Sequence, residues 1–205
     1  MLGRLQKKIN QIRSSEISDF LRLRVFPLDL ITTESKRLTD LLAAMLDFAR
    51  VDSGRLGLLM DDHDPELLIL DAFERLEVLA GDRLRLAASG SLRFPLIKVD
   101  EQRLQQCLAA IVDNALRYSS GTVQLALTLD SDRVIFHVID QGDGFAEAER
   151  DAVLQRFYRG NASIGTRGSG LGLSIVDELV RLMGGNLVLE SESSGGADVQ
   201  LQFTF

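Results

Sequence analysis

GSGLGLSIV, residues 168–176, places three glycines within five positions directly before a run that is typical of a buried helix. Glycine is a poor helix former, because it loses more backbone freedom on folding than any other residue. Helix stability therefore cannot explain why glycine is concentrated at this point. The pattern indicates a place where side chains would obstruct a close approach, and the surrounding sequence has to show what approaches the backbone.

The sequence around this stretch alternates strands and helices from about residue 55 to the C-terminus. Asp64, Pro65 and Glu66 are typical of a helix start, with a capping side chain, a proline in the first turn and an acid near the positive end of the helix. Asp100 is expected to cap a second helix in the same way. The expected elements are helices at 65–80, 101–118 and 173–183, short strands at 83–87 and 96–99, a hairpin at 122–140 that turns at 130–133, and strands at 186–191 and 197–205.

The second strand of the expected hairpin indicates how the sheet is arranged. Residues 134–140 are apolar on both faces of an extended strand, which predicts a position in the centre of the sheet. The order of elements predicts an α+β fold, a two-layer sandwich in which three helices pack on a mixed β-sheet. Residues 55–205 are expected to form one domain of this kind.

The first 54 residues predict helices instead of a mixed fold. Apolar residues at intervals of three, four and three between Leu2 and Ile12 follow the seam of a coiled coil. A second apolar helical stripe follows Pro27 and ends near Gly54. Neither stripe can be buried by its own helix, so residues 1–54 are interpreted as an α-helical dimerisation segment.

Composition limits the classes of function. The 205 residues carry a formal net charge of −7, which argues against nucleic acid as the main partner because phosphate backbones need a clustered basic face. No apolar run reaches the roughly 18 residues of a membrane helix, so a cytoplasmic location is expected, as a free protein or as the cytoplasmic part of a membrane-anchored sensor. The single cysteine, Cys107, excludes a disulfide framework and is expected in the core.

Four short motifs stand out within residues 55–205: IVDNALRYS at 111–119, DQGDGF at 140–145, RFYRG at 156–160 and GSGLGLSIV at 168–176. Taken singly, each has an ordinary explanation as a locally bonded asparagine, a turn or a flexible loop. Three other glycine motifs do not fit. A Walker phosphate loop needs Gly-Lys before Ser or Thr, a dinucleotide fingerprint needs its glycines after a first strand, and an EF-hand needs a ligand where Gly142 stands.

Taken together and in this order, the four motifs resemble the ATP-binding domain of bacterial sensor histidine kinases, within the wider family of DNA gyrase B, Hsp90 and MutL. They correspond to the N, G1, F and G2 boxes of that family, and the resemblance implies its Bergerat ATP-binding fold over residues 55–205. Residues 34–56 also resemble the second helix of a histidine kinase dimerisation domain.

The resemblance implies a site for ATP and Mg²⁺. Asn114 would hold the magnesium that bridges the phosphates, because an amide oxygen is a hard ligand that adds no charge. Arg117, one turn on, would meet phosphate oxygens, and Tyr118 would lie against the adenine. Asp140 resembles the carboxylate that accepts a hydrogen bond from the adenine amino group and so distinguishes ATP from GTP. Asn114 and Arg117 are therefore the candidate catalytic residues, and Asn114 the candidate metal ligand.

The glycine-rich motifs are implied to surround the nucleotide. Gly142 and Gly144 would let the backbone pass beneath the base. Residues 157–159 resemble the hinge of a lid formed by 160–170, with Arg159 as a phosphate partner. The lid ends where a helix begins, so backbone N–H groups and the positive end of the helix dipole would face the phosphates. The cofactor-binding residues implied there are Gly168, Gly170, Leu171, Gly172 and Leu173.

The chain departs from the family in two places. The resembling kinases phosphorylate a histidine on the first dimerisation helix, but residues 1–62 contain none, and Arg22 would stand at that position. Arginine cannot replace it, because the guanidinium group stays protonated. Ala110, one turn before Asn114, stands where the kinases carry Asn and the ATP-hydrolysing relatives carry a Glu that activates water, so rapid ATP hydrolysis is not expected.

Three functions remain open on the sequence. The leading hypothesis is the ATP-binding core of a two-component sensor histidine kinase, a transferase that dimerises through its N-terminal helices, with a response regulator or phosphoacceptor domain as partner. Its acceptor histidine would be supplied in trans or by a dimerisation helix that is missing from this sequence. The alternative is a nucleotide-binding pseudokinase that pairs with other kinases without phosphotransfer. An ATPase of the gyrase or chaperone kind is disfavoured by Ala110 and the short lid. His63 and His137, the two histidines, are interpreted as structural residues.

Overall fold

The computed structural model of the chain describes residues 35, 56–87, 93–146, 149–155, 158, 170–191 and 195–205. The chain divides into two compact units, Met1–Leu46 and Asp47–Phe205. Of the N-terminal helices expected from the sequence, only Ser35 is described, and it is helical and exposed. The proposed dimerisation segment otherwise lies outside the described residues. Among the residues described, no helix combines the length and the apolar composition that crossing a membrane requires.

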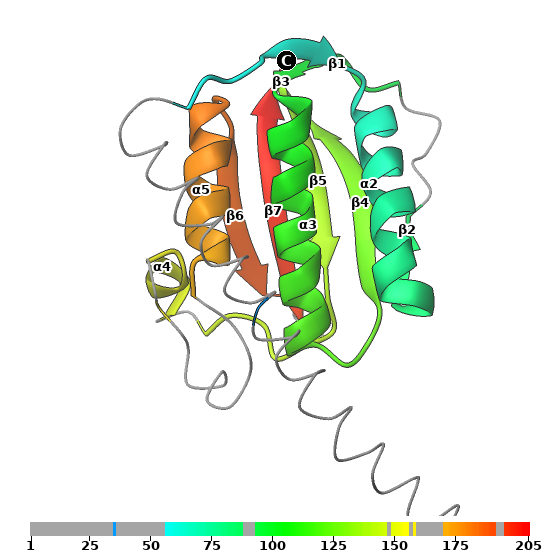
Figure 1. Cartoon of the computed structure of the whole chain (residues 1–205), viewed down its shortest axis with the longest axis vertical. Coiled ribbons are helices and arrows are strands. Elements are labelled where there is room, and N and C mark those ends of the chain that lie inside the picture. The colour runs from blue at the N-terminus through cyan, green and yellow to red at the C-terminus, as the bar shows by residue number, and fades with distance from the viewer. Residues whose placement is uncertain are drawn as a thin grey trace, which may run out of the picture. The chain divides into compact units, whose positions relative to one another are not determined.

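A five-stranded mixed sheet forms one layer of the second unit (Figure 1). Its strands, in spatial order, are β2 (Leu84–Leu86), β4 (Val123–Asp130), β5 (Arg133–Ile139), β7 (Ala197–Thr204) and β6 (Asn186–Ser191). The pair β2 and β4 is parallel and the other pairs are antiparallel. The strand β5 is central, as its apolar faces predicted.

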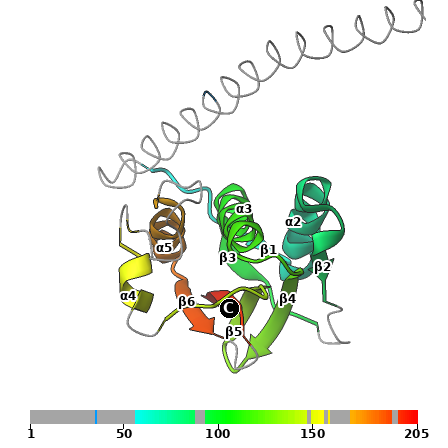
Figure 2. The same cartoon turned by 90° about the horizontal axis from the view of Figure 1, so that it is seen from below.

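The helices form the second layer and cover one face of this sheet (Figure 2). The three long helices are α2 (Pro65–Ala80), α3 (Glu101–Tyr118) and α5 (Gly172–Leu182). A short helix, α4 (Arg150–Val153), and a 3₁₀ turn, η1 (Gly81–Arg83), complete the helical elements of the described residues. The predicted α+β two-layer sandwich is therefore confirmed.

The helix starts read from the sequence are present with their capping bonds. Oδ1 of Asp64 accepts a hydrogen bond of 2.8 Å from the backbone N–H of Glu66. Oδ1 of Asp100 accepts one of 3.1 Å from the N–H of Arg103, and its Oδ2 accepts one of 2.8 Å from the N–H of Leu59. Asp100 therefore caps α3 through one oxygen. Through its other oxygen it fixes the segment around Leu59, which is 41 positions away in the sequence.

One strand pair was not expected. Residues Asp61–His63 form β1, which pairs antiparallel with β3 (Ile97–Val99) in a separate two-stranded sheet. His63, expected at the edge of a loop, is the last residue of β1. No local pattern indicated this strand, because Asp-Asp-His has no apolar alternation. The three residues are extended only through pairing with a distant strand.

Smaller corrections concern where elements begin and end. The strand expected at 83–87 is shortened to β2 because Arg83 belongs to η1, and the strand expected from residue 96 begins at Ile97. The helix α5 begins at Gly172, one residue earlier than expected, and ends at Leu182. Backbone hydrogen bonding assigns this first glycine to the helix. The low helix propensity of glycine made a later start the natural expectation from the sequence.

The core lies between the sheet and the helices. Alternate residues of β5, Val134, Phe136 and Val138, point inward and are almost fully buried. Phe136 packs edge to face on Phe203 of β7, with ring centroids 6.2 Å apart. Cys107 of α3 is fully buried in this core, as expected, and burial raises the pKa of its thiol to about 12 while the charge of Arg103 lowers it less.

Candidate nucleotide site

Three segments that carry predicted site residues meet at one end of the domain: the C-terminal end of α3, the loop after β5 and the N-terminal end of α5. All three lie at the lower end of the molecule in Figure 1. The approach is close, because a Cβ placed on Gly142 would lie 2.8 Å from the backbone oxygen of Tyr118. Asn114, Asp140 and Gly172 mark the three segments and are 26 to 58 positions apart in the sequence. The fold therefore brings distant parts of the chain to one place.

The last two turns of α3 carry the first group of candidates. Asn114 is half-buried, and Arg117 and Tyr118 are exposed, with 40% of Tyr118 accessible. The guanidinium of Arg117 pairs with the carboxylate of Asp113 at 2.6 Å. Ala110, on the same face as Asn114 and one turn before it, is half-buried and packs against the core.

Arg83 holds the end of α3 in place. Its Nε donates to the backbone oxygen of Gly121 at 3.0 Å, its Nη1 to that of Leu116 at 3.1 Å and its Nη2 to that of Ser119 at 2.6 Å. The last carbonyls of a helix lack partners within the helix, and a cation there is also favoured by the helix dipole. Sequence reasoning missed this residue, because nothing local links an arginine of η1 to a helix end more than thirty positions away.

Asp140 lies at the end of β5 and is 8% exposed. Its Oδ1 accepts hydrogen bonds from the N–H of Gly142 at 2.7 Å and from the N–H of Ala197 at 3.3 Å. Its own N–H donates to the backbone oxygen of Ala197 at 2.9 Å. The carboxylate is therefore fixed through one oxygen, and Oδ2 takes part in none of these three bonds. A carboxylate oxygen outside these bonds is an acceptor that can receive a hydrogen bond from a ligand.

The two glycines after Asp140 are required by protein packing as well as by any ligand. A Cβ on Gly142 would meet the Tyr118 carbonyl at 2.8 Å and Oδ1 of Asp140 at 3.0 Å. Gly144 has a φ of +72°, and its Cβ would lie 2.6 Å from the backbone oxygen of Gly196. The sequence suggested clearance beneath a base, and the structure adds a second reason, which is close contact with the protein's own backbone.

The N-terminus of α5 has the features of an anion-binding helix end. Its N-cap, Leu171, is 4% exposed and makes no side-chain capping bond, and no acidic residue lies in the first turn. Gly170 has a φ of +69°, which favours glycine, and a Cβ on Gly172 would meet nothing within 4 Å. Leu171 and the half-buried Leu173 anchor the turn to the core, as expected. The positive end of the helix dipole and the open space beside Gly172 favour a negatively charged group here.

Several predicted lid residues lie outside the described part of the chain. These are Arg159 and Gly168, together with Phe157 and Arg167. Tyr158 is described and half-buried, and its N–H donates to the backbone oxygen of Gln155 at 3.3 Å. Desolvation, followed by a hydrogen bond to Glu149 and the charge of that residue, raises the pKa of the Tyr158 phenol.

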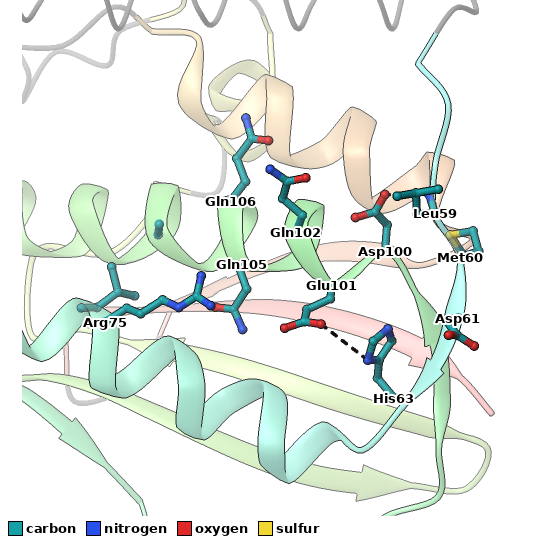
Figure 3. Close-up of a pocket in the computed structure, with 12 residues that line it drawn as sticks. Leu59, Met60, Asp61, His63, Arg75, Asp100, Glu101, Gln102, Gln105 and Gln106 are labelled. Atoms are coloured by element: carbon teal, nitrogen blue, oxygen red, sulfur yellow. Dashed lines mark hydrogen bonds and ion pairs between the residues drawn. The ribbon is translucent and has the colours of Figure 1, made fainter.

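A separate groove of about 920 Å³ lies at the opposite end of α3, between that helix, α2 and β1 (Figure 3). In it, Nδ1 of His63 lies 3.9 Å from a carboxylate oxygen of Glu101. No predicted nucleotide residue lines this groove. Its lining residues are Leu59, Met60, Asp61, His63, Arg75, Leu76, Asp100, Glu101, Gln102, Gln105, Gln106 and Ala109.

Comparison with known proteins agrees with the geometry. The profile of the family described as "Histidine kinase-, DNA gyrase B-, and HSP90-like ATPase" matches residues 99–205. The signal transduction histidine-protein kinase AfsQ2 of Streptomyces coelicolor is 31% identical over 82% of this chain and 31% of its own length. The circadian input-output histidine kinase CikA of Synechococcus elongatus is 30% identical over 82% of this chain and 23% of its own length.

A solved structure extends this likeness to three dimensions. The crystal structure of full-length ShkA in complex with AMPPNP is 31% identical, with a TM-score of 0.70 over 82% of this chain and 36% of that chain. The chain thus spans less than a third of the length of either curated relative and about a third of ShkA. Since the family profile covers half of the sequence and the fold agrees with it, this chain belongs to the histidine kinase-, DNA gyrase B- and HSP90-like ATPase family and carries the ATP-binding catalytic domain of a sensor histidine kinase.

Proposed function

We propose that this chain binds Mg-ATP at the end of the domain where α3, the loop after β5 and α5 meet, and transfers the γ-phosphoryl group to a histidine outside these 205 residues. The observation that carries the proposal is the convergence of a fixed, buried carboxylate, Asp140, with the N-terminal end of α5, whose first turn holds no acidic residue. A carboxylate suits an amino group of a base, and a helix N-terminus suits phosphates.

On the adenine side, Asp140 would accept a hydrogen bond from the amino group through Oδ2. Tyr118 would lie against the base, since its ring is partly accessible and its backbone touches the glycine loop. Gly142 and Gly144 would keep the loop close to the base. GTP carries a carbonyl where ATP carries the amino group, so an ionised Asp140 would reject it.

On the phosphate side, backbone N–H groups of the turn into α5 would bind phosphate oxygens. The residues proposed there are Gly168, Gly170, Leu171, Gly172 and Leu173, with Arg159 as a further cation. Arg117 would exchange its partner Asp113 for a phosphate, because a bidentate phosphate contact is stronger than an exposed ion pair.

The residues present fit a magnesium ion that is held mainly by the nucleotide. Within the described residues, no group of three or more His, Cys, Asp or Glu side chains could hold a metal. Asn114 is half-buried near the C-terminal end of α3 and would supply one amide oxygen to the ion, with phosphates and water as its other ligands. When bound, the ion would neutralise charge on the phosphates.

The proposed transfer breaks the bond between the γ-phosphorus and the β,γ-bridging oxygen of ATP. A bond forms between that phosphorus and an imidazole nitrogen, ADP leaves, and the imidazole gives up its proton. The chain's residues would align the phosphates and stabilise charge, which is the main work of phosphoryl-transfer catalysts. Position 110 holds alanine, so no carboxylate stands there to activate water, which favours transfer over hydrolysis.

Neither histidine of this chain is suited to be the acceptor. Both ring nitrogens of His137 lie in hydrogen bonds, Nε2 with Thr128 Oγ1 at 2.8 Å and Nδ1 with Asp198 Oδ2 at 3.0 Å. His137 also lies on the sheet face opposite the inward-pointing Phe136. His63 lines the groove at the other end of α3. A histidine outside these 205 residues is therefore the proposed acceptor, supplied in trans by a sibling kinase or a phosphoacceptor domain, or by a dimerisation helix that is missing from this sequence.

The partners proposed for the whole protein follow from this chemistry. Residues 1–54 would pair two copies of the chain through their apolar helical stripes. A response regulator would receive the phosphoryl group from the histidine. A protein that draws on cellular ATP would act in the cytoplasm.

Incubation with γ-labelled ATP, Mg²⁺ and an intact histidine-containing dimerisation domain tests the proposal. Label should appear on the acceptor as an acid-labile, base-stable phosphoprotein, and Asn114→Ala should reduce the initial rate at least tenfold, in line with the loss of a ligand to the ion that bridges the phosphates. Gln102→Ala is the matched control, because it removes an exposed amide from the same helix three turns away. Tight ATP binding with no label on any acceptor would refute phosphotransfer and indicate a regulatory nucleotide-binding module.

A further inference from the structure

The end of β6 is hydrogen-bonded to the loop that follows Asp140. Ser191 is the last residue of β6, and its Oγ accepts a hydrogen bond of 2.9 Å from the backbone N–H of Phe145. The same hydroxyl donates one of 2.9 Å to the backbone oxygen of Phe145. One side chain thus satisfies both backbone groups of a residue 46 positions away, which is the pairing that a neighbouring strand would otherwise provide.

The loop and the hairpin also interlock through their glycines. A Cβ on Gly144 would lie 2.6 Å from the backbone oxygen of Gly196 and 3.1 Å from the Ser191 hydroxyl. A Cβ on Gly196, whose φ is +113°, would collide with the backbone oxygen of Asp140. Residues of β6 and of the segment before β7 therefore contact the loop at its start, at Asp140, and at its end, at Phe145.

We propose that Ser191 is a positioning residue for base recognition, which acts through Phe145 and the loop 140–145 and does not touch the nucleotide. This inference rests on the proposed ATP site. The segment between Asp140 and Phe145 contains two glycines and is intrinsically flexible, so without a second anchor only the bonds at Asp140 would define its path. When Ser191 is hydrogen-bonded to Phe145, the loop is fixed at both ends. Gly142 is then held where its N–H donates to Asp140.

The expected consequence is a loss of selectivity. Removing the hydroxyl leaves both backbone groups of Phe145 to water, and the loop then has to be ordered when ATP binds. We expect Ser191→Ala to weaken ATP binding about tenfold, equivalent to about 1.4 kcal/mol. Weak GTP binding should change less, because GTP does not use the fixed carboxylate, so the ratio of the two affinities falls.

The test measures dissociation constants for ATP and GTP by calorimetry on the full chain, together with hydrogen exchange of the Phe145 amide. Ser191→Thr keeps the hydroxyl and should restore ATP affinity to within about threefold of wild type, which is the context dependence expected of a single hydrogen bond. Thr204→Ala is the control, because it removes an exposed hydroxyl from the far end of β7. The Phe145 amide should exchange faster in Ser191→Ala only.

A second substitution covers the case in which Ser191→Ala does not fold. Ser191→Cys has a similar size but a much weaker donor and acceptor, so it should show the same loss of ATP selectivity in smaller degree. Unchanged ATP affinity in folded Ser191→Ala or Ser191→Cys, or an equal loss in Thr204→Ala, overturns the positioning role. Wild-type chain that binds no ATP overturns the proposed function itself, and this result is visible before any variant is made.

Discussion

Asp140 and Ala197 hold each other through two hydrogen bonds across neighbouring strands. The N–H of Asp140 donates to the Ala197 carbonyl at 2.9 Å, and the N–H of Ala197 donates back to Oδ1 of Asp140 at 3.3 Å. The second bond uses a side-chain oxygen where an ordinary ladder would use a carbonyl. The end of β5 is therefore turned so that a buried carboxylate, and not the next peptide, faces the start of β7. Sheet pairing thus uses the N–H and Oδ1 of Asp140, and the proposed base contact uses the other oxygen, Oδ2, of the same carboxylate.

Asp140→Asn should separate these two roles. The amide oxygen can still accept from Gly142 and Ala197, so the fold should be retained. The amide NH₂ would then face the adenine amino group, donor against donor. We expect ATP affinity to fall roughly 10- to 100-fold, the range for a hydrogen bond to a charged group that leaves a donor unpaired. Calorimetric titration with ATP checks this, and an unchanged dissociation constant would remove Asp140 from the site.

Arg83→Ala should destabilise the domain by about 2 kcal/mol, because two carbonyls at the end of α3, those of Leu116 and Ser119, and the Gly121 carbonyl just beyond it lose a charged donor. Arg83→Lys should recover less than half of this loss, since an ammonium group cannot reproduce the fork of the guanidinium. Urea unfolding followed by circular dichroism measures both. Arg85→Ala, at an exposed position of β2, is the control and should change the free energy of unfolding by less than about 0.5 kcal/mol. Equal effects of Arg83→Ala and Arg85→Ala would contradict the capping role.

Gly172→Ala should increase stability while weakening nucleotide binding. Nothing lies within 4 Å of the added Cβ, and alanine favours a helix over glycine by about 0.5–1 kcal/mol. In the proposed complex the same space is next to the phosphates, so ATP affinity should fall while unfolding requires more urea. Gly57→Ala also has an open environment and serves as the control away from the site. Higher stability with full ATP affinity would show that the phosphates do not approach Gly172.

Cys107 should be unreactive in the folded protein. Its pKa of about 12 in the core leaves almost no thiolate at pH 8, and the side chain is fully buried. A chromogenic disulfide reagent should label it only after unfolding in urea. Labelling of the native chain at the rate of the unfolded chain would contradict this burial.

The raised pKa of the Cys107 thiol also predicts how the free energy of unfolding depends on pH. The unfolded thiol ionises near pH 9.0 and the folded thiol near pH 12, so the unfolded state loses its proton first. The contribution of Cys107 is therefore complete below pH 9 and is lost as the pH rises toward 12. Other groups titrate in this window, so the informative quantity is the free energy of unfolding of wild type minus that of Cys107→Ala. That difference should shrink between pH 9 and 12 and stay constant between pH 6 and 8.

Local signals in the sequence predicted much of the secondary structure. The caps Asp64 and Asp100 and the hairpin of β4 and β5 depend on residues near one another in the chain, so their bounds agree with the structure within a residue or two. The strand β1 was missed for the opposite reason, whereas its partner β3 was expected to within one residue. The three residues of β1 carry no periodic pattern and are extended only because a distant strand pairs with them.

The candidate site divides in the same way. The order and chemistry of Asn114, Asp140 and the glycines before α5 were readable, because each motif is continuous. The contacts that position them were not, since Arg83 and Ser191 reach backbone atoms more than thirty positions away. The ion pair between Arg117 and Asp113 was overlooked as well, although their i, i+4 spacing on α3 is the signal that could have indicated it.

By itself, the sequence determined the class of fold, the order of the four motifs, and the absence of any histidine before residue 63. Periodicity, caps and residue chemistry are properties of neighbouring residues, so they survive without coordinates. Only the tertiary structure decided that β7 fixes Asp140 and that Arg83 binds the carbonyls at the end of α3. It also decided that the glycines of the loop 140–145 lie against β6 and the segment before β7, where Ser191 bonds the loop. These are long-range hydrogen bonds and steric contacts, and they exist only once the sheet has brought distant backbone segments together.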